Sequence, residues 1–169
     1  STTTWFQATD ETTGRLCELR VLSLAGASSV QRDRWRREAG RRLVHPTLVR
    51  VVSAAQAGDL AWIATDARPD EVPLEAVVRR DGPLPALRAA RIGLDLARAL
   101  DVVHARGLVH RSLGPASVLI GGGGHDDTAR LADLGLAASL RSADEGAGVT
   151  ASGEILGDPS YCAPEARGG

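Results

Sequence analysis

Apolar and polar positions alternate in short runs over the first 65 residues, and this alternation is typical of β-strands. Residues 4–9 and 16–22 form two such runs, and a glycine near the end of the segment between them favours a turn. Two further runs cover 48–54 and 60–65. An arginine-rich stretch at 29–43 has a helical period and stops before a proline. These residues predict a small antiparallel sheet with one inserted helix.

After a polar connector at 66–73, the apolar positions follow a helical period. The run at 74–80 predicts a short helix, and the run at 85–106 predicts the longest helix of the chain. A proline in its first turn and a glycine just beyond its last turn support these bounds. The long helix has one apolar side, which consists of Leu87, Leu94, Ala97 and Val103-His104 and is extended by Ile92, Leu96 and Leu100.

Short apolar runs return at 118–120 and 129–132, joined by a glycine-rich turn at 121–128. Together with the preceding elements, they predict an α+β fold. In this fold a small antiparallel sheet with one helix precedes a mostly helical part.

Composition narrows the class of protein. Hydrophobic residues make up 43% of the 169 positions and the net charge is −1, which excludes a disordered tail and a strongly basic nucleic-acid binder. No apolar run approaches the roughly 18 residues of a membrane-spanning helix. Cys17 and Cys162 form neither a disulfide framework nor a metal site. We therefore expect a cytoplasmic domain with reduced thiols and no membrane span in this chain.

Two residue types that carry much enzyme chemistry are missing. All 20 basic residues are arginine, and the sequence contains neither lysine nor asparagine. A mechanism that requires a lysine ammonium or an asparagine carboxamide is therefore excluded for this chain acting alone.

Five segments in a fixed order resemble the bacterial eukaryotic-type, or Hanks-type, Ser/Thr protein kinases. They are ATDETTGRLCELRVL at 8–22, RREAGRRLVHPTLVRVV at 36–52, HARGLVHRSLGPASVLI at 104–120, LADLGLA at 131–137 and GDPSYCAPEARGG at 157–169. The resemblance implies a two-lobe kinase-like fold. Its small lobe would cover 1–66 without the first strand and the glycine-rich loop. Residues 67–73 would be the hinge, and 74–169 a large lobe truncated after the activation segment.

The resemblance also shows which kinase residues are replaced. The lysine that holds the nucleotide phosphates is Arg20 here, and arginine does not replace lysine at a tight phosphate contact. Glu38 stands at the position of the helix glutamate, and we expect Arg20 and Glu38 to form a structural ion pair.

The catalytic loop is altered at each polar position that the chemistry uses. His110-Arg111-Ser112 replaces His-Arg-Asp, and a serine without an adjacent base cannot accept a proton near neutral pH. Gly114 replaces the loop lysine, and Ser117 replaces the metal-ligating asparagine. We expect His110 to be a structural residue.

Asp133 matches the remaining metal-binding aspartate, and it either binds a metal or accepts backbone hydrogen bonds at a turn. Thr65, Asp66 and Ala67 occupy the segment that would border an adenine. A set of hydroxyls near the end of the chain could accept phosphate from another kinase: Ser139, Ser142, Thr150 and Ser152.

We therefore predict a pseudokinase, a regulatory or protein-binding domain without phosphotransfer. The alternatives are a weakly active or ATP-binding Ser/Thr kinase domain and a purely structural remnant. No cofactor is expected, and any binding of ATP and magnesium is expected to be weak. A protein partner or self-association is expected, because a truncated large lobe leaves part of the 85–106 helix uncovered. No nucleic-acid partner is expected.

Overall fold

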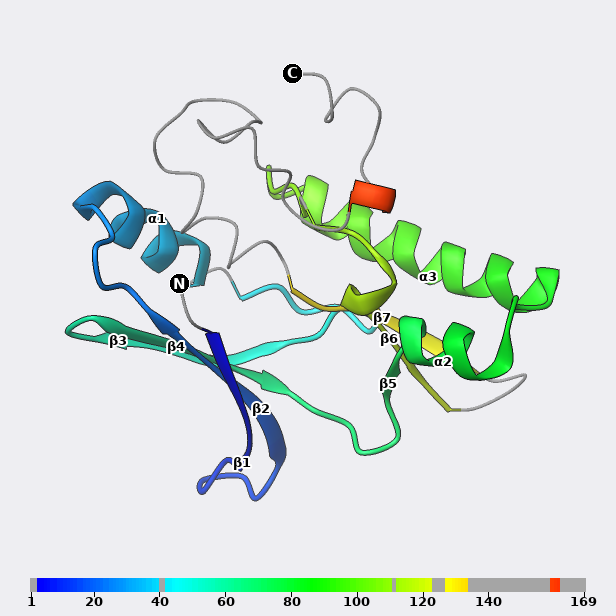
Figure 1. Cartoon of the computed structure of the whole chain (residues 1–169), viewed down its shortest axis with the longest axis horizontal. Coiled ribbons are helices and arrows are strands. Elements are labelled where there is room, and N and C mark those ends of the chain that lie inside the picture. Colours follow the sequence, from blue (N-terminus) through cyan, green and yellow to red (C-terminus); the bar gives the residue numbers. More distant parts are fainter. Residues whose placement is uncertain (1–2, 40–41, 111, 123–126, 134–158, 162–169) are drawn as a thin grey trace.

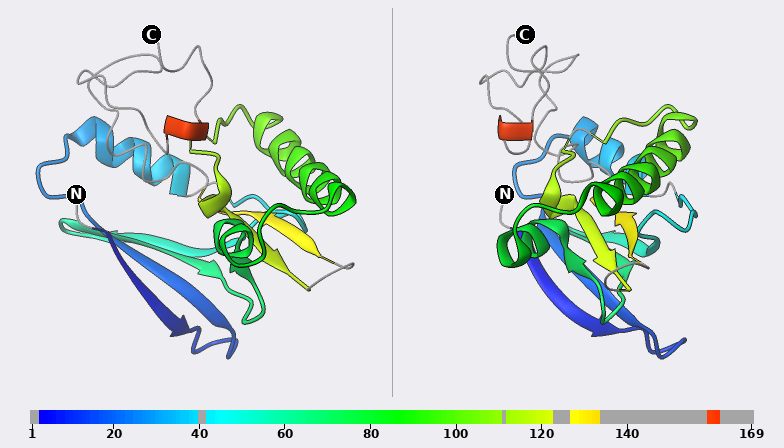
Figure 2. Two further views of the ribbon diagram at one scale, coloured as in Figure 1. Left: turned by 45° about the vertical axis from the view of Figure 1, so that its right-hand side comes forward. Right: turned by 90° about the vertical axis from the view of Figure 1, so that its right-hand side faces the viewer.

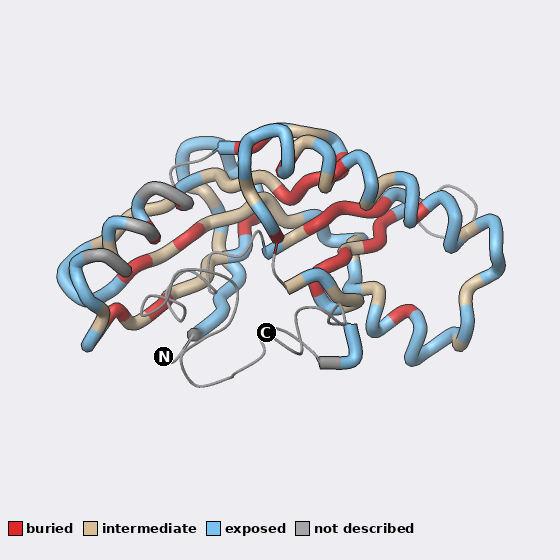
Figure 3. The backbone as a smooth tube through the Cα atoms, turned by 90° about the horizontal axis from the view of Figure 1, so that it is seen from above, coloured by how far each residue is buried: buried red, intermediate tan, exposed pale blue. Residues whose placement is uncertain are grey.

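The computed structural model describes residues 3–39, 42–110, 112–122, 127–133 and 159–161 of the chain. Two antiparallel sheets form the framework. Figure 1 shows a four-stranded sheet with helix α1 above it, and a three-stranded sheet beside helices α2 and α3. Buried positions lie where the helices meet the strands (Figure 3).

The four-stranded sheet contains the predicted strands. In chain order they are β1 (Thr3–Thr9), β2 (Leu16–Ser23), β3 (Val51–Ala57) and β4 (Leu60–Asp66), arranged as β1-β2-β4-β3. The strand predicted at 48–54 starts three residues too early. Residues 47–49 bond instead to β7 (Thr128–Leu131), because the Val49 amide donates to the Leu131 carbonyl at 2.9 Å and the Leu131 amide donates to the Thr47 carbonyl at 2.8 Å.

Helix α1 (Ser29–Ala39) covers one face of this sheet. Trp35 and Ala39 pack with Ile63 and other inward-facing strand residues in one buried cluster. The predicted helix at 29–43 is too long at its C-terminal end. Leu43 lies outside any helix and is buried in a second cluster, beneath α3.

The second part of the chain contains a smaller sheet and the helices α2 and α3. Its elements are β5 (Val72–Pro73), α2 (Leu74–Asp81), α3 (Ala86–His104), the 3₁₀ turn η1 (Pro115–Ser117), β6 (Val118–Gly121), β7, and the 3₁₀ turn η3 (Pro159–Tyr161). The strands are arranged as β5-β6-β7. Helix α3 packs over β7, and the predicted helices at 74–80 and 85–106 are confirmed to within two residues at each end.

The buried side of α3 contains Ile92 and Val103 of the predicted apolar set, and leaves out Leu87 and Leu94. Ile92, Ala99 and Val103 are buried, and their spacing places them on one stripe of the helix. Leu87 and Leu94 lie on the opposite side and are 60% and 52% exposed. The apolar pattern of this helix has two stripes, and the residues that the structure describes cover only one of them.

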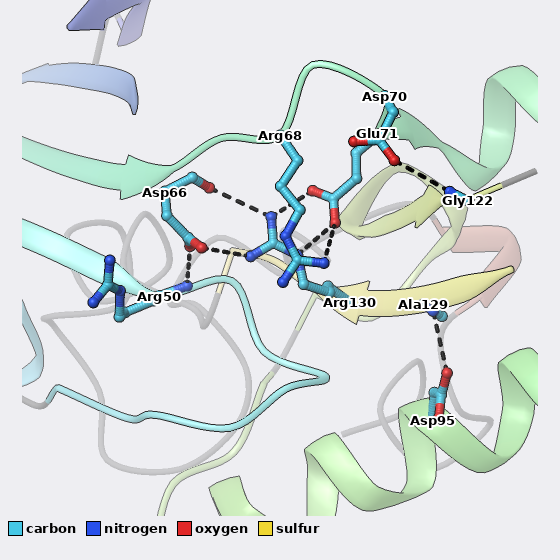
Figure 4. Close-up of polar contacts among 9 residues, drawn as sticks. All are labelled: Arg50, Asp66, Arg68, Asp70, Glu71, Asp95, Gly122, Ala129 and Arg130. Carbon is cyan, nitrogen blue, oxygen red and sulfur yellow. Dashed lines mark hydrogen bonds and ion pairs between the residues drawn. The ribbon is translucent and has the colours of Figure 1, made fainter. Parts of the chain in front are cut away.

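Arg130 on β7 stabilises the connector at 66–73 between the two sheets (Figure 4). Its side chain is buried, and it donates to a carboxylate oxygen of Asp66 at 2.8 Å and to both carboxylate oxygens of Glu71, one of them at 2.6 Å. Burial works against the charge, but Glu71 and Asp66 together raise the pKa of Arg130. Because Asp66 ends β4 and Glu71 precedes β5, one guanidinium holds both ends of the connector.

Candidate functional site

A small cavity lies between the inner face of the four-stranded sheet and the residue that follows β7. It measures about 30 Å³. Its lining comes from β1 to β4 and from two residues outside the strands, one before β3 and one two positions beyond β7: Trp5, Glu18, Arg20, Val49, Val51, Ile63, Thr65 and Asp133. Strand pairing brings the first three together, because Trp5 lies opposite Arg20 in the sheet and Glu18 shares the face of Arg20.

Arg20 crosses this cavity. Its guanidinium lies 3.7 Å from the centroid of the Trp5 ring and forms an ion pair with the carboxylate of Asp133. The Arg20 side chain is only 12% exposed. Burial lowers the pKa of Arg20 to about 10, against the opposing effect of the Glu18 carboxylate, so the guanidinium stays charged at neutral pH.

Asp133 follows β7 in a left-handed backbone conformation, with a φ of 59°. Aspartate tolerates this region better than most residues. The conformation belongs to a residue whose carboxylate faces Arg20 and also borders the cavity of the altered catalytic loop. Among the side chains that the structure describes, Asp133 is the carboxylate partner of Arg20, and the side chain of Glu38 is not one of them.

The altered catalytic loop borders a second cavity of about 270 Å³. Its lining comes from residues 112–117 of that loop and from three residues distant in the sequence, Glu75, Asp133 and Tyr161. The buried hydroxyl of Ser117 donates to the Gly114 carbonyl at 2.9 Å and accepts from the Gly114 amide at 3.2 Å. The hydroxyl of Ser117 is thus occupied in closing the loop.

His110 stabilises this loop through hydrogen bonds of its ring. Its ring is buried, and Nε2 donates to the Ala132 carbonyl at 2.7 Å while Nδ1 accepts from the Ser112 amide at 3.4 Å. This pattern suits a neutral ring with its proton on Nε2. Burial lowers the pKa of His110, although the bond to Ala132 opposes the shift.

The three residues predicted to border an adenine make different contacts. Thr65 lines the small cavity, and its hydroxyl donates to the Glu18 carbonyl at 3.5 Å. Asp66 turns toward Arg130 and accepts from the Arg50 amide at 2.6 Å. The Ala67 amide donates to the Leu16 carbonyl at 3.3 Å, so this connector donor already has an acceptor within the chain.

The predicted phosphate acceptors contribute nothing to this geometry. The candidate phosphate acceptors Ser139, Ser142, Thr150 and Ser152 lie outside the described residues. Among the residues that the structure does describe, no three His, Cys, Asp or Glu side chains gather as metal ligands, and no helix is long and apolar enough to cross a membrane.

Sequence reasoning missed Trp5, Glu18 and Arg130. The signal for the first two was present, because alternation along 4–9 and 16–22 places Trp5, Glu18 and Arg20 on one face once the strand register is known. Arg130 carried no such signal, since its partners are far away in the sequence.

The fold consists of two lobes joined by a connector. One lobe is a sheet covered by one helix, the other is a second sheet covered by helices, and the cleft lies between them. This arrangement defines a protein-kinase-like two-lobe fold. The kinase domain of Mycobacterium tuberculosis PknI, solved as a double mutant, matches 90% of this chain and 60% of its own, with a TM-score of 0.69 and 26% identity. A structure of Rad53 in complex with AMP-PNP matches 80% of this chain and 35% of its own, with a TM-score of 0.70 and 22% identity.

The family model described as protein kinase domain matches residues 1–168, and the chain belongs to this family. Serine/threonine-protein kinase PkaA of Streptomyces coelicolor is 38% identical over 92% of this chain, which corresponds to 28% of PkaA. PknB of Mycolicibacterium smegmatis is 35% identical over 80% of this chain and 22% of its own length. The chain therefore spans less than a third of these relatives.

Proposed function

We propose that this domain is a pseudokinase, a regulatory or protein-binding member of the kinase family without phosphotransfer activity. The observation that carries the proposal is the closed cleft, in which Arg20 pairs with Asp133 against the ring of Trp5. The remaining cavity of about 30 Å³ has room for about two water molecules. Sites for small ligands usually measure roughly 300 Å³ or more.

The ion pair opposes catalysis at two positions at once. Phosphoryl transfer in this family uses a cation on the nucleotide phosphates and a carboxylate on the magnesium ion. In this chain the candidate cation, Arg20, and the candidate carboxylate, Asp133, neutralise each other. A nucleotide with its metal would have to separate them and also displace Trp5 and Glu18 from the cavity.

The altered loop removes the remaining chemistry. Ser112 stands where the family has the carboxylate that accepts the substrate proton, and its hydroxyl is a poor base near neutral pH. The hydroxyl of Ser117 bonds to Gly114 and is a weaker metal ligand than a carboxamide oxygen. Neither a base nor a second metal ligand is therefore present at the positions that the family uses.

The test is transfer of radiolabelled phosphate from ATP to a generic basic protein substrate. We expect no incorporation by the natural chain and none by Ser112→Asp, because restoring the base leaves the phosphate anchor and the second metal ligand unrestored. Incorporation that is clear in the natural chain and lost in Asp133→Ala would contradict the proposal.

The second candidate is a weakly active or ATP-binding Ser/Thr kinase domain. Two observations favour it: Asp133 is retained at the end of β7, and the similar relatives are named as serine/threonine-protein kinases. The same labelling experiment separates the candidates, since only the second predicts incorporation that depends on Asp133.

The proposal also covers location and partners. We propose a cytoplasmic domain whose ligand is a protein or a second copy of itself. The free thiol of Cys17, buried between β1 and β4, fits a reducing compartment. The pair of Arg20 with Glu38 and the phosphate acceptors near the end of the chain remain predictions.

A further inference from the structure

Residues 130–133, which end β7 and follow it, contact the four-stranded sheet and the segment leading into β3 at three places. Figure 2 shows this segment running beside β7, and Leu48 and Leu131 form a parallel bridge there. The three contacts are the ion pair of Arg130 with Asp66, the backbone bonds of Leu131 with Thr47 and Val49, and the ion pair of Asp133 with Arg20. One short stretch of chain thus bonds to β2, to the end of β4 and to the segment before β3.

The ion pair of Arg130 with Asp66 is largely removed from water. The Arg130 side chain is 1% and the Asp66 side chain 26% exposed, and Nη1 lies 2.8 Å from one carboxylate oxygen. The other carboxylate oxygen of Asp66 accepts from the Arg50 amide at 2.6 Å, so both oxygens are held. Water screens such a pair weakly, and removing one partner therefore costs more than at the surface.

The connector between the two sheets is bonded to both of them. Toward the four-stranded sheet, the Ala67 amide donates to the carbonyl that begins β2 at 3.3 Å. Toward the smaller sheet, Asp70 accepts from the Gly122 amide at 3.2 Å, and Glu71 accepts from Arg130 (Figure 4). Domain closure needs a few connecting residues whose backbone angles are free to change. These bonds leave the connector little of that freedom.

Leu131 lies between the two ion pairs along the chain. Its carbonyl and its amide both bond to the segment before β3, and its side chain is buried in the cluster beneath α3. Arg20 and Asp66 lie on neighbouring strands three positions apart in register, which separates them by roughly 11 Å. A rotation about Leu131 that separates one ion pair therefore also displaces the partners of the other. Opening the cleft at Arg20 thus requires that the pair at Asp66 break as well.

We propose that the two ion pairs on either side of Leu131 lock the cleft shut, so that the two sheets keep one orientation in the folded chain. This inference rests on the proposed function, because it explains how the cleft stays closed to nucleotide. Kinases close around their ligands by hinge movement of their domains. This chain would lack that movement and would present one fixed surface to a partner protein.

The experiment measures residual dipolar couplings of the backbone N–H groups in the isotope-labelled full chain, without nucleotide. A chain whose sheets keep one orientation aligns in a dilute liquid-crystalline medium as one body. A single alignment tensor then fits the couplings from both sheets, and we expect this result for the natural chain. Sheets that move against each other would need separate tensors.

The variant Asp66→Asn tests the lock at the pair with Arg130. A carboxamide has one acceptor oxygen in place of two, so it cannot accept from both Arg130 and the Arg50 amide. The buried pair of Arg130 with Glu71 is retained in this variant. We expect the couplings of the smaller sheet to lose their fit to the tensor of the four-stranded sheet.

The matched control is Asp59→Asn, which makes the same change in an ion pair with Arg32 at 2.7 Å, within the part formed by α1 and the four-stranded sheet. One tensor should still fit both sheets.

If Asp66→Asn loses the dispersed amide spectrum of a folded chain, Arg130→Met/Glu71→Met replaces it with the same expectation, because it removes both buried charges together. A natural chain that needs separate tensors, or a folded lock variant that keeps the single fit, overturns the proposal. Since no nucleotide is present, either result would leave the phosphate-labelling test of the proposed function unaffected.

Discussion

Arg20 contributes to the stability of the cleft as well as to its closure, because one guanidinium contacts both Trp5 and Asp133. Methionine at this position would keep the apolar stem and lose the ion pair and the ring contact. We predict that Arg20→Met lowers the free energy of unfolding by about 1 kcal/mol. Urea denaturation of the variant and the natural chain measures this loss of unfolding free energy.

The control for this prediction is Arg79→Met. Arg79 also pairs with a carboxylate, that of Glu75, but both side chains are well exposed, so its loss should cost less than about 0.5 kcal/mol. Equal losses for the two variants would mean that the contacts of Arg20 add no more than a surface pair.

His110 gives the fold a dependence on pH. Its pKa is lowered by burial, so between the folded and the unfolded pKa the unfolded chain binds more protons than the folded one. The free energy of unfolding therefore decreases as pH falls below about 6.5, and it is fully retained above that value. Protonation would also turn Nδ1 into a donor facing the Ser112 amide.

This prediction is checked by urea denaturation at pH 8 and pH 5. His110→Gln should show a smaller loss between these pH values than the natural chain. The exposed His104→Gln variant should retain the full loss. The assignment to His110 fails if the two variants behave alike.

At the scale of elements, Gly121 at the end of β6 lies close against the side chains of the connector. A Cβ atom there would lie 2.9 Å from Cγ of Glu71 and 3.2 Å from a carboxylate oxygen of Asp70. Glu71 cannot move freely, because Arg130 holds it in a buried position. We predict that Gly121→Ala costs about 1–3 kcal/mol of unfolding free energy.

Gly93 on α3 supplies the comparison for Gly121. A Cβ at this helical position meets nothing within 4 Å, so Gly93→Ala should stabilise the chain by up to about 1 kcal/mol. Urea denaturation of both variants in the same buffer measures the two changes in the free energy of unfolding. If Gly121→Ala left the free energy of unfolding unchanged, the side chains of Glu71 and Asp70 would be shown to move aside without cost.

The sequence was sufficient for most elements because their signals are local. Alternation and helical period located β1, β2, β4, α2 and α3, and capping residues helped to place the ends of α3. The start of β3 and the end of α1 were displaced, because Leu48 and Leu43 are drawn into the core beneath α3. Such long-range packing leaves no periodic signal.

At the scale of the whole molecule, the described residues form three buried clusters, and the cluster of Leu43 and Leu48 with Leu131 connects the segment before β3 to the smaller sheet. One lies under α1, one joins Leu48 and Leu131 to α3, and one packs α2 and α3 against β6 and β7. The sequence predicted the two-lobe fold and the positions of Arg20, Ser112, Ser117 and Asp133 through resemblance to kinases. It did not predict the contact of Arg20 with Asp133, because two segments more than 100 positions apart meet there.

We propose that the pair of Arg20 with Asp133 closes the cleft to nucleotide with magnesium. The most direct measurement is the thermal unfolding midpoint of the full chain with ATP and magnesium, compared with ATP and a chelator. Ligands that bind the folded state raise the midpoint. We expect the same midpoint in both conditions and without nucleotide. A rise of several degrees (on the scale of about 1 kcal/mol or more) that requires magnesium would contradict it.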